Sequence, residues 1–230
     1  MHKKILLFNI FVLLHTIAIA QGTYEAGTLP KLNASASISE LWEVNFKGES
    51  KLIFSRGEFG GGSGVRQFNH NRTELALGLE RKTSYNTAIT GGYLLRMDER
   101  KPSHRLFQQF SLVRQYGSFN LGHRFAADQT FSIGRGNEYR IRYRISTSLP
   151  LSGEKIDIKE TYLKFSHEYL GSLLKRNTAL EIRNLAALGY VTGTKDKIEG
   201  GFSYRAEKVF QSSTNSEFWI YLAFYFDLDK

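Results

Sequence analysis

The sequence predicts an all-β protein, a single antiparallel transmembrane β-barrel of about ten strands, with eight or twelve strands as the alternatives. Two observations predict this fold. Charged and apolar residues alternate along most of the chain, and this is the period of an extended strand because successive side chains point to opposite faces. The chain also begins with the features of an export signal. Together they are typical of a barrel with a polar lumen and an apolar outside.

Residues 1–20 form the predicted signal peptide. Lys3 and Lys4 give a basic start, an apolar run follows, and Ala18 and Ala20 supply the small residues for cleavage after Ala20. An uncleaved membrane anchor is the alternative, but the apolar run is short for a membrane span. We therefore expect an exported protein of the bacterial outer membrane.

Residues 21–41 are expected to be an N-terminal lead-in, in which 31–38 form a short strand that does not span, and residues 42–230 the barrel domain. An even number of strands would place both termini on the periplasmic side. The three prolines, at positions 30, 102 and 150, are assigned to strand boundaries or turns. The predicted strands are 42–55, 66–82, 86–98, 103–115, 118–132, 137–149, 158–170, 179–190, 197–209 and 216–228.

The strand at 137–149 shows the alternation most clearly. Arg140 and Arg142 share one face with Glu138, whereas Tyr139 and Ile141 share the other. Because lipid excludes charge, we expect the arginine face to line the lumen. The predicted lumen charge network comprises Arg72, Glu74, Glu80, Arg105, Arg124, Glu138, Arg140, Arg142, Arg144, Glu181, Arg183, Glu199, Arg205 and Glu207.

The composition bounds the chemistry. The chain has no cysteine and therefore no disulfide or thiol site, and its formal net charge is +9. The arginines alternate instead of forming a basic run, so charge pairing inside the barrel is favoured over an anionic partner and no nucleic acid is expected. The histidines lack the spacing of metal ligands. We expect no cofactor and no metal.

Five segments resemble domain-of-unknown-function family 2490, small outer-membrane β-barrel-like proteins of Bacteroidetes. They are H-R-L-F-Q-Q at 104–109, H-R-F-A-A at 123–127, E-Y-R-I-R-Y-R at 138–144, E-I-R-N-L-A-A-L-G-Y at 181–190 and I-E-G-G-F-S-Y-R at 198–205. The resemblance implies an outer-membrane location and no known activity. Ala126 departs from the acidic residue that the pattern implies at this position.

Catalysis finds little support in the sequence. A lipid hydrolase or acyltransferase of the membrane would pair a serine with a histidine base, and the candidates are His167 with Ser166 and His70 with Ser63. Neither pair has the sequence context of barrel lipases. We expect no catalytic residues and no enzymatic activity.

The functional expectation is an outer-membrane barrel with a charged, largely plugged lumen and a structural role or a narrow transport or binding role. No substrate is indicated. Its expected partners are outer-membrane lipid, lipopolysaccharide and the barrel-assembly machinery, and the oligomeric state is left open. One alternative is a soluble periplasmic barrel with the faces reversed, apolar inside, that binds a hydrophobic ligand. The other is a lipid-modifying enzyme of the outer membrane.

Overall fold

The computed structural model describes residues 22–61, 64–98, 101–117, 119–134, 136–211 and 213–229. The predicted signal peptide and its cleavage site lie outside these residues. Within the described part of the chain, no helix is long and apolar enough to cross a membrane.

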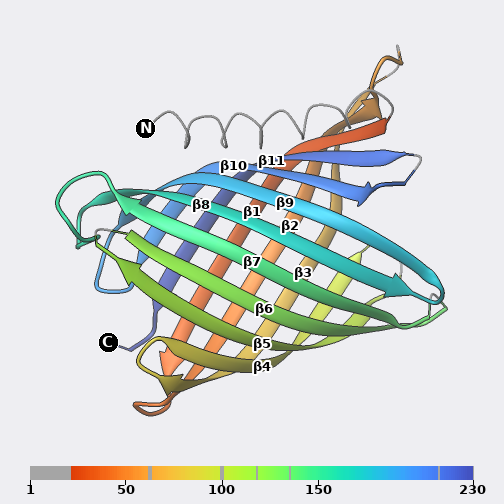
Figure 1. Cartoon of the computed structure of the whole chain (residues 1–230). Coiled ribbons are helices and arrows are strands. Elements are labelled where there is room, and N and C mark those ends of the chain that lie inside the picture. The colour runs from red at the N-terminus through yellow and green to blue at the C-terminus, as the bar shows by residue number, and fades with distance from the viewer. Residues whose placement is uncertain are drawn as a thin grey trace.

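Eleven strands of the described chain form one closed barrel (Figure 1). Each strand pairs with its neighbours in sequence, and β11 closes the barrel by pairing with β1. The strands are β1 Gly22–Ser37, β2 Trp42–Glu58, β3 Val65–Ser84, β4 Thr87–Asp98, β5 Ser103–Tyr116, β6 Phe119–Ser132, β7 Glu138–Pro150, β8 Thr161–Leu174, β9 Asn177–Val191, β10 Lys197–Val209 and β11 Thr214–Asp227.

The predicted all-β barrel is confirmed, and the strand number is one higher than the expected ten. The expected lead-in at 21–41 is wrong for most of its length, because Gly22–Ser37 forms β1. This strand pairs antiparallel with β2 and parallel with β11. A parallel closure follows from an odd number of strands, and it places Gly22 and Asp227 at opposite ends of the barrel. The expectation that both termini share one side is therefore wrong.

Pro30 lies inside β1 and not at a strand boundary, which corrects a second expectation. It stands opposite Leu222 of β11, but the register with β2 skips from Thr28 to Lys31. Proline has no N–H to donate to a ladder. Pro30 lies where β1 is paired with β11 but not with β2. Its missing N–H therefore removes no bond from the β1–β2 ladder.

The other ten strands lie close to their predicted positions. β10 matches its predicted range, whereas β8 begins and ends later than expected and β2 continues to Glu58. Tight two-residue turns join β8 to β9 and β3 to β4. Lys175, in the β8–β9 turn, adopts a φ of 58°, as is typical of the primed turns that favour two-residue hairpins.

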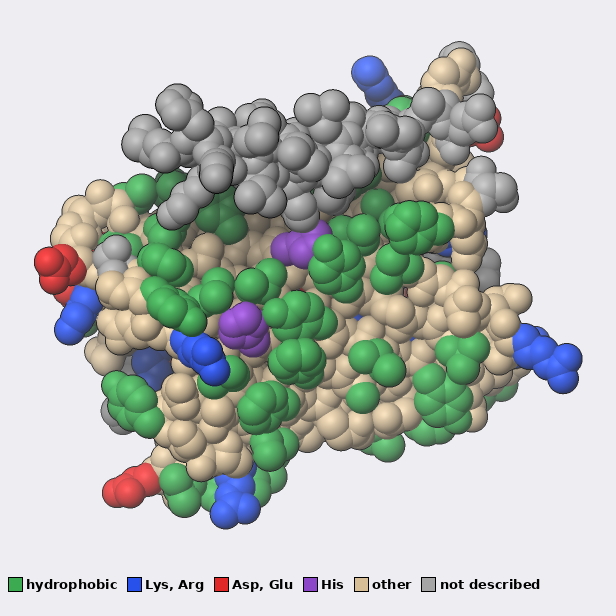
Figure 2. Space-filling view, in the orientation of Figure 1, with side chains coloured by type: hydrophobic (Ala, Val, Ile, Leu, Met, Phe, Trp, Pro, Cys, Tyr) green, Lys and Arg blue, Asp and Glu red, His purple; other side chains and the backbone are tan. Residues whose placement is uncertain are grey.

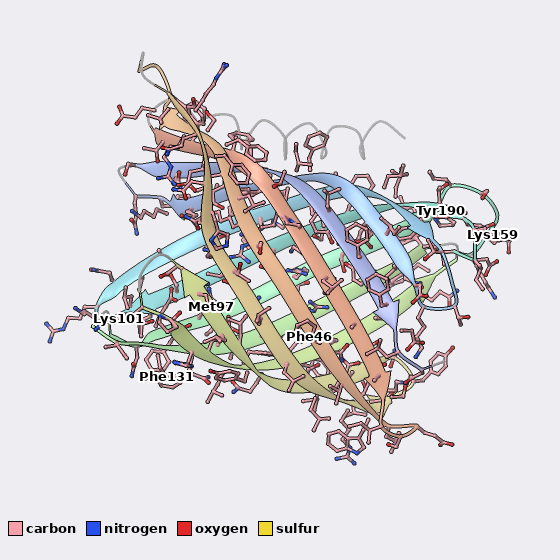
Figure 3. All side chains as sticks on the ribbon, turned by 180° about the vertical axis from the view of Figure 1, so that it is seen from behind. Phe46, Met97, Lys101, Phe131, Lys159 and Tyr190 are labelled. Carbon is pink, nitrogen blue, oxygen red and sulfur yellow. The ribbon has the colours of Figure 1, made fainter. Side chains whose placement is uncertain are left out.

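The outward face of the barrel is apolar on all eleven strands. Large side chains such as Phe46, Ile141 and Phe202 point away from the lumen and are exposed. Figure 2 shows hydrophobic side chains across the middle of one face, with most of the visible charged side chains near its ends. In Figure 3, Lys101 and Lys159 extend from opposite ends of the barrel. The surface is an apolar band between two charged rims.

Exposed aromatic residues mark both ends of this band. Tyr190 lies near the end that carries Lys159, and Phe131 near the opposite end (Figure 3). Trp42, Tyr85 and Tyr116 are also exposed at or beside strand ends. Aromatic rings at these positions are typical of the interfacial girdles of membrane barrels.

Candidate binding site in the barrel lumen

The inward face of the barrel carries buried charge. Glu199, Glu217 and Asp128 are each about 1% exposed, and Arg105 and Arg205 are nearly as buried. Isolated buried charges are costly, so each is expected to find a partner of opposite charge or a hydrogen-bond partner.

The arginines of β7 share two carboxylates on neighbouring strands. Arg140 and Arg142 each place a guanidinium nitrogen 2.8 Å from an oxygen of Asp128 on β6. Arg144 reaches Glu168 on β8, with an N–O distance of 2.7 Å. Three cations of one strand therefore depend on two acids.

Arg183 on β9 connects this group to the next strands. It pairs with Glu181 at 2.6 Å and with Glu168 at 3.1 Å. Arg205 on β10 lies 3.8 Å from Glu49 on β2. Two strands, β11 and β1, separate β10 from β2, so this pair crosses part of the lumen.

The remaining predicted residues make smaller local contacts. Glu74 accepts from Arg96 at 2.7 Å and lies 3.4 Å from Arg72. Contacts with neutral partners join Arg105 to Thr130 (2.9 Å), Glu80 to Thr90 (3.0 Å) and Glu207 to Asn215 (3.3 Å). Arg124 and Glu138 make no hydrogen bond or ion pair with any residue that the structure describes.

Glu199 is the centre of a second cluster, on the other side of the lumen. Its carboxylate accepts from Lys164 at 2.7 and 2.8 Å and from the hydroxyl of Tyr162 at 2.7 Å. Tyr221 and Tyr225 donate to it at 2.9 and 3.1 Å. Five hydrogen bonds from four side chains of β8 and β11 saturate this buried acid.

Glu217 on β11 belongs to the same side. It accepts from Lys51 at 2.7 Å and from the indole N–H of Trp219 at 2.9 Å, and the Lys51 ammonium lies 4.6 Å from the Trp219 ring centroid. Trp219 packs with Leu29 and Ile53, and all three are 1% exposed. A cation–π contact and an apolar cluster therefore fill this part of the lumen.

Several lumenal residues escaped the sequence prediction. Asp128, Glu168 and Lys164 occupy the charged parity of strands that were correctly located, so their parity was the signal that could have identified them. Lys31 and Glu25 escaped because β1 was taken for a lead-in. The tyrosines around Glu199 gave no signal, since aromatic residues occur on both faces of strands.

The lumen encloses a cavity of about 440 Å³. Thirteen lysine or arginine residues line it, against the four carboxylates of Glu49, Glu74, Asp128 and Glu168. All eight arginines of the predicted network are among them. The arrangement is a cationic cavity inside an apolar cylinder.

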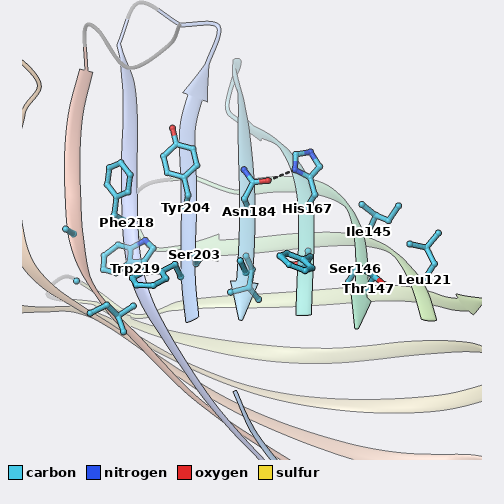
Figure 4. A pocket seen from close by; sticks show the side chains of 18 of the residues that line it. Leu121, Ile145, Ser146, Thr147, His167, Asn184, Ser203, Tyr204, Phe218 and Trp219 are labelled. Carbon is cyan, nitrogen blue, oxygen red and sulfur yellow. Dashed lines mark hydrogen bonds between the residues drawn. The ribbon is translucent and has the colours of Figure 1, made fainter. Parts of the chain in front are cut away.

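A second, apolar hollow on the outer face is lined by residues of β1, β2 and β6–β11 (Figure 4). His167 on β8 and Asn184 on β9 point into it and share a hydrogen bond of 2.7 Å. Ser166 precedes His167 directly, so the two side chains lie on opposite faces of β8, and Ser166 also lines the lumenal cavity. This placement does not give a serine with a histidine base. Ser63, the candidate partner of His70, lies outside the described residues.

The other three histidines of the barrel also lie on the outward face. His104 contacts the hydroxyl of Tyr93, and His123 bonds Tyr143 at 2.9 Å. His70 bonds Thr73 at 2.9 Å. Among the residues that the structure describes, no group of three or more His, Asp or Glu side chains could hold a metal ion.

Comparison with protein families gave one finding. The model of a family described as "Protein of unknown function (DUF2490)" matches residues 26–216, from β1 into β11. The chain matched no curated protein and no solved structure.

Proposed function

The chain belongs to the DUF2490 family, and from this premise we propose that it is an outer-membrane β-barrel protein with a narrow, cationic lumen. The observation that carries the proposal is the division between the two faces of the wall. All eleven strands expose large apolar side chains outward, and the charged side chains gather inside. Soluble monomers rarely expose apolar patches beyond a few hundred Å².

Strand length supports the membrane assignment. The strands contain 12 to 20 residues, and a tilted strand of about 9–11 residues crosses the hydrocarbon. A closed barrel leaves no unpaired edge, as lipid requires. The alternative, a soluble barrel with an apolar interior, requires apolar side chains inside and charged side chains outside. This is the reverse of the arrangement in this barrel.

We infer that the lumen does not pass solutes freely. Trp219 with Leu29 and Ile53 fills one sector, and the contact of Arg205 with Glu49 crosses another. Barrels of about eight strands have interiors that side chains can fill, and open porins have about sixteen. Outer-membrane lipid and lipopolysaccharide are the proposed surroundings, with insertion by the barrel-assembly machinery.

Membrane fractionation of expressing cells tests the location. We expect the mature chain in the outer-membrane fraction, soluble only with detergent, and recovery from the periplasm without detergent would refute it. Conductance of the purified protein in planar bilayers tests the lumen. A flat trace is expected, whereas large steps of the kind porins give would show an open pore.

A further inference from the structure

We propose that the arginine side of the lumen binds an oxyanion, a phosphate, sulfate or carboxylate group. The arginine side is defined as Arg105, Arg124, Arg140, Arg142 and Arg144, on β5, β6 and β7. The inference goes beyond the proposed function. It depends on the geometry inside the barrel and not on where the barrel resides.

The first observation is an excess of positive charge in an enclosed space. Thirteen cations and four acids line the cavity. Glu181, Glu199 and Glu217 lie outside its lining and pair with Arg183, Lys164 and Lys51, but counting them still leaves cations in the majority. Charge of one sign in a low-dielectric wall concentrates ions of the opposite sign.

The second observation concerns Arg124. It stands directly opposite Arg144 in the β6–β7 register, and like charges at such positions repel. Arg144 has Glu168 as a partner, whereas Arg124 has neither an ion pair nor a hydrogen bond with the described residues. Among the described residues that line the cavity, Arg124 is exposed and the others are buried or half-buried, so Arg124 is the arginine that a solute in the lumen can reach most easily.

The third observation is a set of buried donors without acceptors. Nη2 of Arg105 and Nε of Arg140 and Arg142 have no hydrogen-bond partner in the part of the chain that the structure describes, although all three residues line the cavity. Arg105 is 4% exposed and Arg140 is 8% exposed. Buried unpaired donors are rare, and a bound anion would supply the acceptors that these nitrogens lack.

The chemistry of these donors selects the ligand class. A guanidinium is a planar fork that matches the geometry of carboxylate and phosphate oxygens. A cavity of about 440 Å³ falls within the usual range of small-molecule sites, about 300–1,000 Å³. It has room for a free inorganic anion or for the anionic end of a larger solute.

Titration of the purified full barrel in neutral detergent tests the inference. Inorganic phosphate is the probe, with chloride at equal ionic strength as the control for screening, and binding is followed by calorimetry and by the shift in thermal unfolding. Saturable phosphate binding and a rise in unfolding temperature are expected, because a ligand that binds only the folded state stabilises it. Sulfate and acetate arms separate phosphate preference from general oxyanion binding.

Two variants locate the site. Arg124→Gln is expected to weaken phosphate affinity at least about tenfold, whereas Arg176→Gln, the same change in the exposed β8–β9 turn, is expected to match the wild type. Arg124→Lys keeps the charge without the fork, so it should give an intermediate affinity and serves if the Gln variant does not fold. No saturable binding, or equal affinity in wild type and Arg124 variants, would overturn the inference. Neither result would alter the outcome of membrane fractionation.

Discussion

The two sides of the lumen satisfy their charges in different ways. On the acid–aromatic side, defined as Glu199, Glu217, Trp219, Tyr221 and Tyr225, each buried carboxylate has a lysine and aromatic donors. On the arginine side, Arg140, Arg142 and Arg144 pair with Asp128 and Glu168, and Arg105 bonds the neutral Thr130. Arg124 has no ion pair or hydrogen bond with the described residues, and three nitrogens of the other arginines find no acceptor among them.

The same lumen therefore contains one cluster with a structural role and one cluster that can bind a ligand. A buried charged cluster that is fully hydrogen-bonded specifies packing and leaves nothing for a ligand to satisfy. A cluster with surplus donors is incomplete without an anion. The acid–aromatic side is therefore the structural half of the lumen, and the arginine side is the half that can bind.

The largest expected effect is at the centre of the acid–aromatic side. Glu199→Ala would leave the half-buried Lys164 without its partner and three phenols without this acceptor, so we expect a loss of about 3–5 kcal/mol in the free energy of unfolding. Urea titration of the refolded barrel measures it. Glu80→Ala is the matched control, because the described contact of Glu80 is one bond from Thr90. A loss no greater than the control's would contradict a structural role for this side.

The outward face of β7, behind the arginine side, offers a test of whether the barrel wall contacts lipid. Ile141 lies between Arg140 and Arg142 on β7 but points outward, 75% exposed. Ile141→Arg should cost about 2–4 kcal/mol in lipid bilayers if this position lies near the bilayer midplane. Ile133→Arg, in the exposed turn after β6, should be nearly neutral. Unfolding in vesicles compares the two, and equal stability would contradict lipid contact at Ile141.

A smaller loss is expected where a glycine leaves room for the ring of Tyr162, which donates to Glu199 of the acid–aromatic side. Gly189 stands opposite Tyr162, and a Cβ there would lie 2.2 Å from the ring. Gly189→Ala should displace this donor from Glu199 and cost about 1–3 kcal/mol by overpacking. Gly171→Ala is the control, since nothing lies within 4 Å of a Cβ at that position. Equal unfolding midpoints for the two variants would show that the ring moves freely.

The smallest effect should have the opposite sign. In phosphate-free buffer, Arg124→Gln removes one of two facing like charges, and we expect it to stabilise the barrel by about 0.2–1 kcal/mol. Thermal unfolding with and without phosphate measures the change. Destabilisation in phosphate-free buffer would mean that Arg124 makes stabilising contacts in the folded barrel. The arginine side would then be satisfied like the acid–aromatic side.

The sequence predicted ten of the strands because their alternation is local and strong. In β7, the alternation that begins with Arg140 and Ile141 is enough to indicate which residues share a face. β1 was predicted only in part, as a short strand at 31–38 that does not span. It carries Gly27, Pro30 and several small residues, so its two faces differ little and the local pattern is weak. Its conformation is imposed by pairing with β2 and β11, and such pairing cannot be inferred from a local pattern.

The predicted lumen network was similarly limited to what parity can show. Parity places Arg205 and Glu49 each on a charged face, but only barrel closure brings them within 3.8 Å. The tyrosines that saturate Glu199 are another case. They come from β8 and β11, which are separated by β9 and β10, and only the curvature of the barrel brings their side chains to the same carboxylate.

The sequence by itself determined the strand period, the division of each strong strand into a charged and an apolar face, and the barrel class, because side-chain direction in a strand depends on near neighbours alone. The tertiary structure decided the strand number, the parallel closure and which face is inside. It also decided that the acid–aromatic side is saturated and that the arginine side has unpaired donors, because those contacts join different strands of the barrel.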